Sequence, residues 1–142
     1  QAYFEALMKT DFGTVQEAIR QPPLAGVYAF FDGERPVYVG RTTKRGLGRR
    51  MKNHLGRTHN HASFAFKLAR EKTGRKTAYS GEGTRANLMK DEVFATAFHD
   101  AVEFVRNLKV RFLEVQDQDE QFLFEYFVCK KLKSPYNDFG TH

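Results

Sequence analysis

The chain has 142 residues, of which 41% are hydrophobic, and it carries a formal net charge of +6. This size favours one compact domain whose core needs neither disulfides nor a structural metal. The lone cysteine, Cys129, excludes an internal disulfide. Together with the expected absence of a signal peptide and of a membrane-spanning helix, it favours a cytoplasmic, intracellular protein.

Basic residues are concentrated in one part of the sequence. From Arg41 to Arg57 there are seven Lys or Arg and no acidic residue, and five more follow between Lys67 and Lys76. Such clustering is expected of a surface that binds a polyanion, whereas a solvated face of ion pairs is the alternative on charge alone. The candidate nucleic-acid-binding residues are Arg41, Lys44, Arg45, Arg49, Lys52, Lys72, Arg75 and Lys76.

A hairpin is the clearest local feature of the N-terminal half. Before it, Thr14 is a suitable N-cap for a short helix over 15–20, which a pair of prolines ends. The β-prone segments 26–31 and 36–40 then flank the turn pair Asp32-Gly33. This pattern predicts an antiparallel hairpin.

Helices dominate the segments predicted after the hairpin. Apolar residues at helical spacing predict helices over 45–56, 62–72 and 91–107, and an alternating segment predicts a third strand over 109–115. The stretch 73–84 is rich in Gly, Ser, Thr and Lys, which predicts a mobile loop.

The last predicted helix contains an unusual carboxylate. Asp117 and Glu120 form a capping-box pattern for a helix that runs to about Lys133. Apolar side chains are spread around it, so we expect much of it to be buried. They are Phe122, Leu123, Phe124, Tyr126, Phe127, Val128 and Leu132. Glu125 lies within this run, where a metal ion or an Arg would relieve the cost of burying its charge. A Glu on a solvent-facing stripe is an equally good interpretation of this residue alone.

Two further pairs of residues are candidates for chemistry. Arg50 and His54 are four residues apart and share one face of a predicted helix. Arg50 can bind a phosphate bidentately, and His54 can hydrogen-bond a phosphate oxygen or transfer a proton. Tyr28 and Tyr38 can project from one face of the hairpin. A phenol, with a pKa near ~10, is a poor base unless cations lower that pKa, as the surrounding Arg residues can. Taken alone, each pair is also explained by ordinary surface or strand residues.

Together these features resemble the GIY-YIG nuclease family. The matching residues are Gly26-Val27-Tyr28, Tyr38-Val39-Gly40, then Leu47, Arg50 and His54, which match the family's first core helix. Glu125 and Asn137 match the family's metal-binding Glu and terminal Asn. The resemblance covers roughly residues 24–56 and 108–139. Val replaces Ile in both motifs, and Arg41 stands where repair members of the family often have Lys. Arg keeps the charge but cannot act as a base.

The resemblance implies an α+β fold: a small three-stranded antiparallel sheet flanked by helices, in a single domain over 1–142 with a helical insertion over about 57–107. It also implies a divalent-metal-dependent endonuclease, acting on DNA in preference to RNA, with one Mg²⁺ or Mn²⁺ held by Glu125 and water. Arg50 would neutralise charge in the transition state, and Tyr28 or Tyr38 would help to deprotonate the attacking water. His54 would orient the tyrosine or the phosphate, and Asn137 would position the other groups.

Two alternatives belong to other functional classes. A catalytically inactive nucleic-acid-binding module with the same fold would keep the basic face, and in a structural or protein-interaction domain that face would be incidental. The complete set of two Tyr, Arg, His, Glu and Asn favours the nuclease over both.

Overall fold

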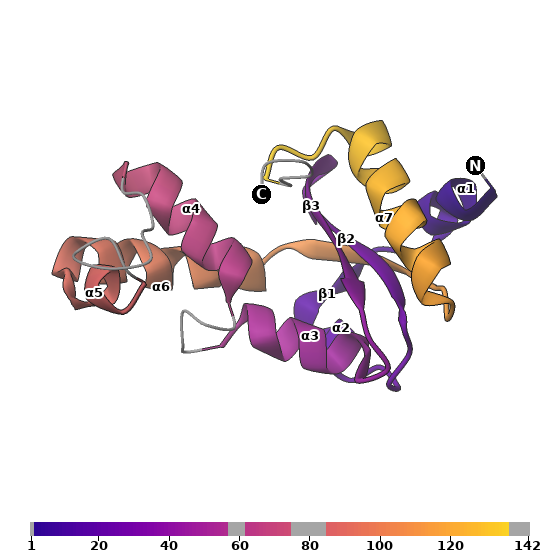
Figure 1. The fold of residues 1–142 in the computed structure, drawn as a ribbon, viewed down its shortest axis with the longest axis horizontal. Coiled ribbons are helices and arrows are strands. Elements are labelled where there is room, and N and C mark those ends of the chain that lie inside the picture. Colours follow the sequence, from indigo (N-terminus) through magenta and orange to yellow (C-terminus); the bar gives the residue numbers. More distant parts are fainter. Residues whose placement is uncertain (1, 57–61, 75–84, 137–142) are drawn as a thin grey trace. The chain divides into compact units, whose positions relative to one another are not determined.

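The computed structural model describes residues 2–56, 62–74 and 85–136 (Figure 1). Asn137 and two of the candidate basic residues, Arg75 and Lys76, lie outside these described residues. Most of the loop predicted over 73–84 lies outside them as well. In the described part of the chain, no helix is both long and apolar enough to cross a membrane.

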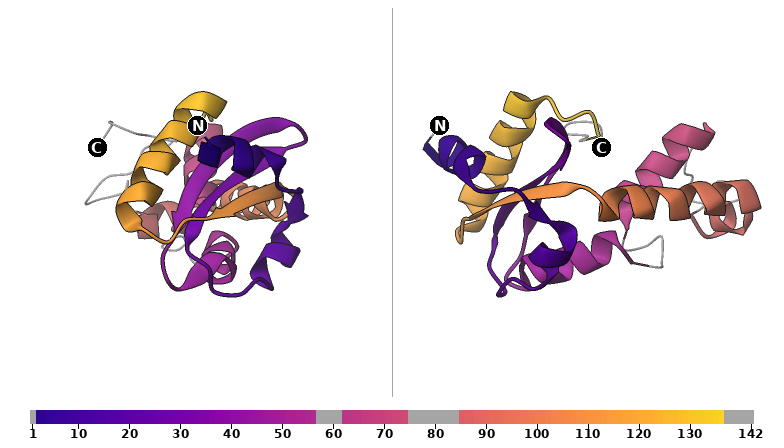
Figure 2. Two further views of the ribbon diagram at one scale, coloured as in Figure 1. Left: turned by 90° about the vertical axis from the view of Figure 1, so that its right-hand side faces the viewer. Right: turned by 180° about the vertical axis from the view of Figure 1, so that it is seen from behind.

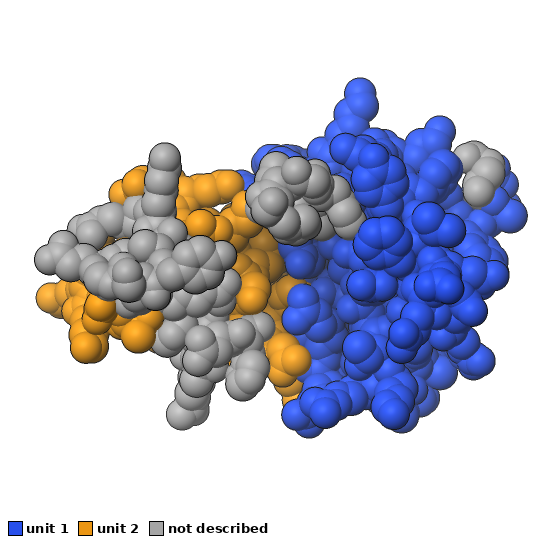
Figure 3. All heavy atoms as spheres, viewed as in Figure 1, with its two compact units in different colours: residues 1–51, 108–142 blue, residues 52–107 orange. Residues whose placement is uncertain are grey.

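Internal contacts divide the chain into two compact units. The first combines residues 1–51 with residues 108–142, and the second is 52–107 (Figure 3). The single domain with an insertion over about 57–107 stays a prediction.

The first unit is built around an antiparallel sheet. Its elements are α1 (Ala2–Lys9), β1 (Gly13–Thr14), α2 (Val15–Ile19), β2 (Gly26–Asp32), β3 (Arg35–Thr42), most of α3 (Gly46–His54), β4 (Lys109–Glu114) and α7 (Gln118–Leu132). The strand order is β1-β4-β2-β3. The predicted α+β class, a small antiparallel sheet flanked by helices, is confirmed, and the two-residue β1 joins the three expected strands.

The predicted hairpin is formed by β2 and β3. Asp32 pairs with Arg35, so the turn lies at Gly33 and its successor, one residue later than predicted. Gly33 has a φ of 63°, a conformation that glycine adopts at little cost. Tyr28 pairs with Gly40, and Phe30 pairs with Tyr38. Because side chains alternate along a strand, both tyrosines project from the same face, as predicted.

Helices cover both faces of the sheet (Figure 2). One face presents Val27, Ala29, Phe31 and Val39, which form a core with α1 and α7. The opposite face carries Tyr28 and its neighbours and is covered by α2 and α3. Thr14 caps α2 as predicted, and the Glu17 side chain completes a capping box with it.

Helix α7 is less buried than its composition predicts. Phe124 and Val128 are buried, but Phe122, Leu123 and Tyr126 are 49%, 67% and 45% exposed. The expectation that much of this helix is buried is therefore wrong for these three apolar residues. Asp117 caps the helix through the backbone N–H of Glu120, and Lys133 ends it in a left-handed conformation.

Three short elements were not predicted: α1, β1 and α5 (Arg85–Lys90). They are too short for apolar periodicity to be recognised. β1 exists because Gly13 and Thr14 pair with the first two residues of β4, a contact between distant parts of the sequence.

The second unit has an aromatic core of its own. It contains α4 (Ser63–Thr73), α5 and α6 (Glu92–Arg106), which confirm the helices predicted over 62–72 and 91–107. Asp91 caps α6 by accepting from the backbone N–H of Val93. Phe66 of α4 packs on Phe94 and Phe98 of α6, with ring centroids 5.1 and 6.3 Å apart.

Candidate active site

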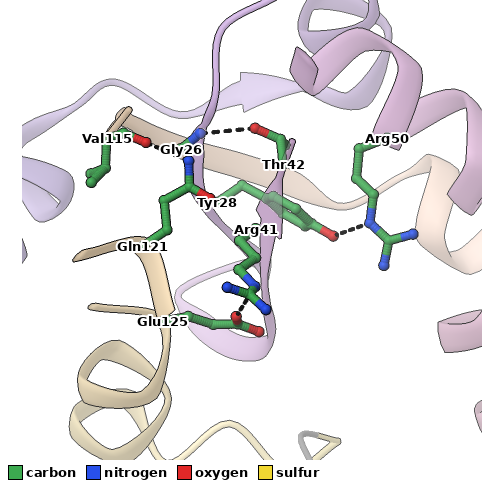
Figure 4. A network of polar contacts seen from close by, with 8 residues as sticks. All are labelled: Gly26, Tyr28, Arg41, Thr42, Arg50, Val115, Gln121 and Glu125. Atoms are coloured by element: carbon green, nitrogen blue, oxygen red, sulfur yellow. Dashed lines mark hydrogen bonds and ion pairs between the residues drawn. The ribbon is translucent and has the colours of Figure 1, made fainter. Parts of the chain in front are cut away.

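The first contact of the site joins a buried tyrosine to an arginine. Tyr28 in β2 is fully buried, and the Nε–H of Arg50 in α3 donates to its hydroxyl oxygen at 3.1 Å (Figure 4). Tyr38 also interacts with Arg50, through a side-chain hydrogen bond. Both hairpin tyrosines therefore interact with the guanidinium of Arg50. The pKa of this guanidinium is raised, chiefly by Tyr28.

Two glycines make room for this contact. A Cβ on Gly48 of α3 would lie 2.5 Å from the carbonyl oxygen of Ile19, so only glycine lets α3 approach α2 so closely. A Cβ on Gly40 would lie 2.2 Å from the Tyr28 hydroxyl oxygen. The glycine that ends the second motif therefore supports the phenol that Arg50 contacts.

Substituting Gly40 tests this support. We expect Gly40→Ala to displace the Tyr28 hydroxyl from Arg50 and to lower stability by about 1–3 kcal/mol, because the buried ring has no room to move. Denaturant unfolding measures the loss, and Gly13→Ala is the matched control, since its Cβ would meet its nearest atom at 3.9 Å. Adding Tyr28→Phe removes the nearest clashing atom and should restore part of the stability. Equal stability of the two Gly variants would contradict the close contact.

The ionisation of Tyr28 differs from the expectation. Burial raises the pKa of its hydroxyl, and the charge of Arg50 only partly offsets this. The expected lowering of this pKa by neighbouring arginines is therefore wrong for Tyr28, because desolvation of a fully buried phenolate outweighs the nearby cation. At neutral pH Tyr28 is a neutral hydrogen-bonding group.

The second contact joins β3 to α7. The Nε of Arg41 lies 3.2 Å from Oε2 of Glu125, whose side chain is only 15% exposed (Figure 4). Burial raises the pKa of the Glu125 carboxyl, while Arg41 and Arg50 lower it. The cationic partner expected for this carboxylate is thus present, and it comes from the predicted nucleic-acid-binding set.

The two contacts are electrostatically coupled. The charge of Arg50 acts on Glu125, and the charge of Glu125 in turn raises the pKa of Tyr28. Four of the six predicted catalytic residues, Tyr28, Tyr38, Arg50 and Glu125, therefore influence one another's ionisation.

The remaining predicted residues are placed differently. His54 is fully buried in the second unit, where its ring meets Phe64 edge-on at 6.3 Å. Lys44, Arg45 and Arg49 are exposed in the first unit. Lys52 and Lys72 are exposed in the second, where the Nζ of Lys72 lies 3.9 Å from Asp100.

Two buried polar residues that position the site were not predicted. Gln121, one turn before Glu125 in α7, donates through Nε2 to the carbonyl oxygen of Val115 (Figure 4). The N–H of Val115 in turn donates to the carbonyl oxygen of Ala25. This holds α7 against the start of β2. The buried Thr42 hydroxyl accepts from the N–H of Gly26 at 2.9 Å and holds the end of β3 beside Arg41. The polar run Asp117-Gln118-Asp119-Glu120 precedes Gln121, so nothing in the sequence marks this residue as buried.

The donor set fits a hard divalent cation with few protein ligands. Among the described residues there is no group of three or more His, Cys, Asp or Glu that could hold a metal. One carboxylate, with water and phosphate oxygens as the other ligands, is a usual environment for Mg²⁺. Glu125 can supply that carboxylate, in competition with Arg41.

Comparison with known proteins finds a structural neighbour only. No family model matches the chain, and no curated protein matches it. The chain is similar in structure to the GIY-YIG N-terminal endonuclease domain of UvrC from Thermotoga maritima, solved as a point mutant bound to its catalytic divalent cation. The identity is 18% and the TM-score 0.48, over 87% of this chain and 94% of that domain. What that domain binds and cuts remains a property of that domain.

Proposed function

We propose that this protein is a divalent-metal-dependent endonuclease that hydrolyses phosphodiester bonds in nucleic acid, with DNA as the preferred substrate. The observation that carries the proposal is the Tyr28–Arg50 hydrogen bond together with the mostly buried Glu125 carboxylate, on which the charge of Arg50 acts. A guanidinium and a carboxylate at one site suit phosphoryl chemistry, because the former binds phosphate and the latter a divalent cation.

Arg50 is assigned to the scissile phosphate. A guanidinium has five N–H donors, so the contacts with the two tyrosines leave donors for phosphate oxygens. Its positive charge would be worth most as negative charge accumulates in the transition state. Tyr28, neutral and buried, holds the guanidinium in place.

Proton transfer from the attacking water is assigned to Tyr38. Tyr28 is fully enclosed and its pKa is raised, whereas Tyr38 is partly exposed on the same sheet face. Only the phenolate form of a tyrosine can accept this proton, and a phenolate is easier to form and to reach at the partly exposed Tyr38 than at the fully buried Tyr28. Orienting roles for His54 and Asn137 stay predictions.

Glu125 is assigned to the cation, Mg²⁺ or Mn²⁺. When bound, such a cation supplies Lewis-acid stabilisation of the phosphate and of the leaving oxygen. Arg41 would have to leave Glu125 to make room for it, and its freed guanidinium could then bind a neighbouring phosphate.

The Arg41–Glu125 ion pair also favours a second candidate, an inactive nucleic-acid-binding module, because it neutralises the carboxylate without a metal. One experiment separates the two functions. Plasmid, single-stranded, branched and RNA substrates are incubated with Mg²⁺, Mn²⁺ or EDTA. Metal-dependent cutting that EDTA abolishes supports the nuclease, and salt-dependent binding without cutting supports the module.

Lys44, Arg45 and Arg49, exposed around the start of α3, are proposed to bind the substrate backbone. We expect affinity in EDTA to fall steeply with salt. In a triple Gln variant the log–log slope should become shallower by about 0.9 for each phosphate that is no longer neutralised. The matched control replaces Lys9, Arg35 and Lys109, three exposed cations outside the basic run. If the two triple variants show the same salt slope, the assignment of Lys44, Arg45 and Arg49 to backbone binding would be wrong.

A further inference from the structure

Helix α7 carries exposed aromatic rings beside the proposed site. Phe122 and Tyr126 are 49% and 45% exposed, and they are four residues apart on the helix that supplies Glu125. Residues at this spacing lie on the same helix face, with Cβ atoms about 5–6 Å apart. An exposed pair of large rings on one face is costly to leave in water and needs a reason.

Cations accompany both rings. The guanidinium carbon of Arg41 lies 5.3 Å from the ring centroid of Phe122, and the Nζ of Lys130 lies 5.4 Å from that of Tyr126. Arg41 is also the ion-pair partner of Glu125, so one guanidinium contacts both the Phe122 ring and the Glu125 carboxylate. Aromatic rings interleaved with cations are the combination that binds single-stranded nucleic acid, where bases stack on rings and cations follow the phosphates.

We propose that Phe122 and Tyr126 form a stacking platform for two unpaired bases next to the proposed active site. The preferred substrate is therefore nucleic acid with a single-stranded stretch, such as a flap, a splayed arm or a junction. The rings favour this class, because neighbouring base pairs cover the faces of the bases inside a duplex, whereas unpaired bases can stack on a side chain. The role of the platform in substrate choice rests on the proposed function. The binding test below does not, because it needs no cleavage.

The test measures binding in EDTA, so that no cleavage is needed. The probes are a single-stranded oligonucleotide that carries 2-aminopurine and the blunt duplex of the same sequence, each titrated with the full chain. The variant is Phe122→Leu with Tyr126→Leu, which keeps an apolar face but removes the flat rings. The control is Leu123→Ala, a 67% exposed apolar residue of the same helix.

We expect the double Leu variant to bind the single strand at least about tenfold more weakly, since one stacked base alone is worth that much. The 2-aminopurine quenching seen with the wild type should be lost with it. Duplex affinity should change less than about twofold, because backbone contacts are untouched. Leu123→Ala should match the wild type on both probes.

Equal losses on the two probes, or no loss on either, would overturn the platform. The latter result, with self-association of the wild type abolished by Leu123→Ala, would identify the face as a protein-docking surface instead. A wild type that cuts nothing while its single-strand affinity depends on the rings would remove the nuclease and leave the platform. If the double Leu variant and the wild type cut both duplex and flap, at the same rates as each other, the platform would be removed and the nuclease would remain.

Discussion

Replacing Glu125 by Gln is expected to lower the cleavage rate by several orders of magnitude while leaving the protein folded. The amide keeps the shape of the side chain but removes the charge that holds a divalent cation, so the Lewis-acid contribution should be lost with the cation. Isothermal titration with Mn²⁺ should show greatly weakened binding, which measures the cause directly and without activity.

Stability and nucleic-acid binding should not fall together with the cleavage rate. A neutral amide is easier to bury than a carboxylate whose pKa burial already raises, so the melting temperature should change by no more than a few degrees. Affinity for nucleic acid in EDTA should be unchanged or higher, because one negative charge is gone and Arg41 loses its ionic partner.

The matched control is Glu120→Gln, an exposed glutamate in the first turn of the same helix. It should cut and bind Mn²⁺ like the wild type. Near-wild-type cleavage by Glu125→Gln in Mg²⁺ would take Glu125 out of the active site and would favour the inactive binding module.

Local patterns predicted the parts of the site that depend on one element or on two adjacent ones. The alternation along β2 and β3 places Tyr28 and Tyr38 on one face, because strand geometry has a period of two residues. The helix predicted over 45–56 is present as α3 and contains Arg50. Such features need only short-range geometry, which the order of residue types encodes directly.

Contacts between distant segments could not be predicted. Arg41 and Glu125 meet because α7 packs across β3, and nothing in the spacing of either segment specifies that partner. The burial of Tyr28 is equally non-local, so its neighbouring arginines suggested a lowered pKa when burial in fact raises it. On α7, apolar residue types predicted burial, although residue type constrains exposure only weakly. Phe122 and Tyr126, which are exposed against this expectation, are the residues of the proposed platform.

Arg50→Lys is expected to reduce the maximal cleavage rate by about 10²-fold or more, the scale of losing one preorganised charge-stabilising donor. The substitution keeps the positive charge, so the loss of cleavage rate measures the geometry of the guanidinium and not its charge. Lys is a point charge on a flexible chain and offers no planar fork for a phosphate. It also lacks the Nε–H that Arg50 donates to Tyr28 at 3.1 Å, so the cation is no longer fixed by the buried phenol.

The adjacent residue provides the control. Arg49 is exposed, whereas Arg50 is partly buried, so Arg49→Lys makes the same chemical change at a position proposed to bind only the substrate backbone. Single-turnover cleavage at saturating substrate should separate the two variants by about two orders of magnitude, the scale of one such donor. Their affinities in EDTA should stay similar, because each keeps its charge and backbone binding depends mainly on charge. Similar rates for the two would mean that Arg50 acts on the substrate only as a cation, and its assignment to the transition state would then be wrong.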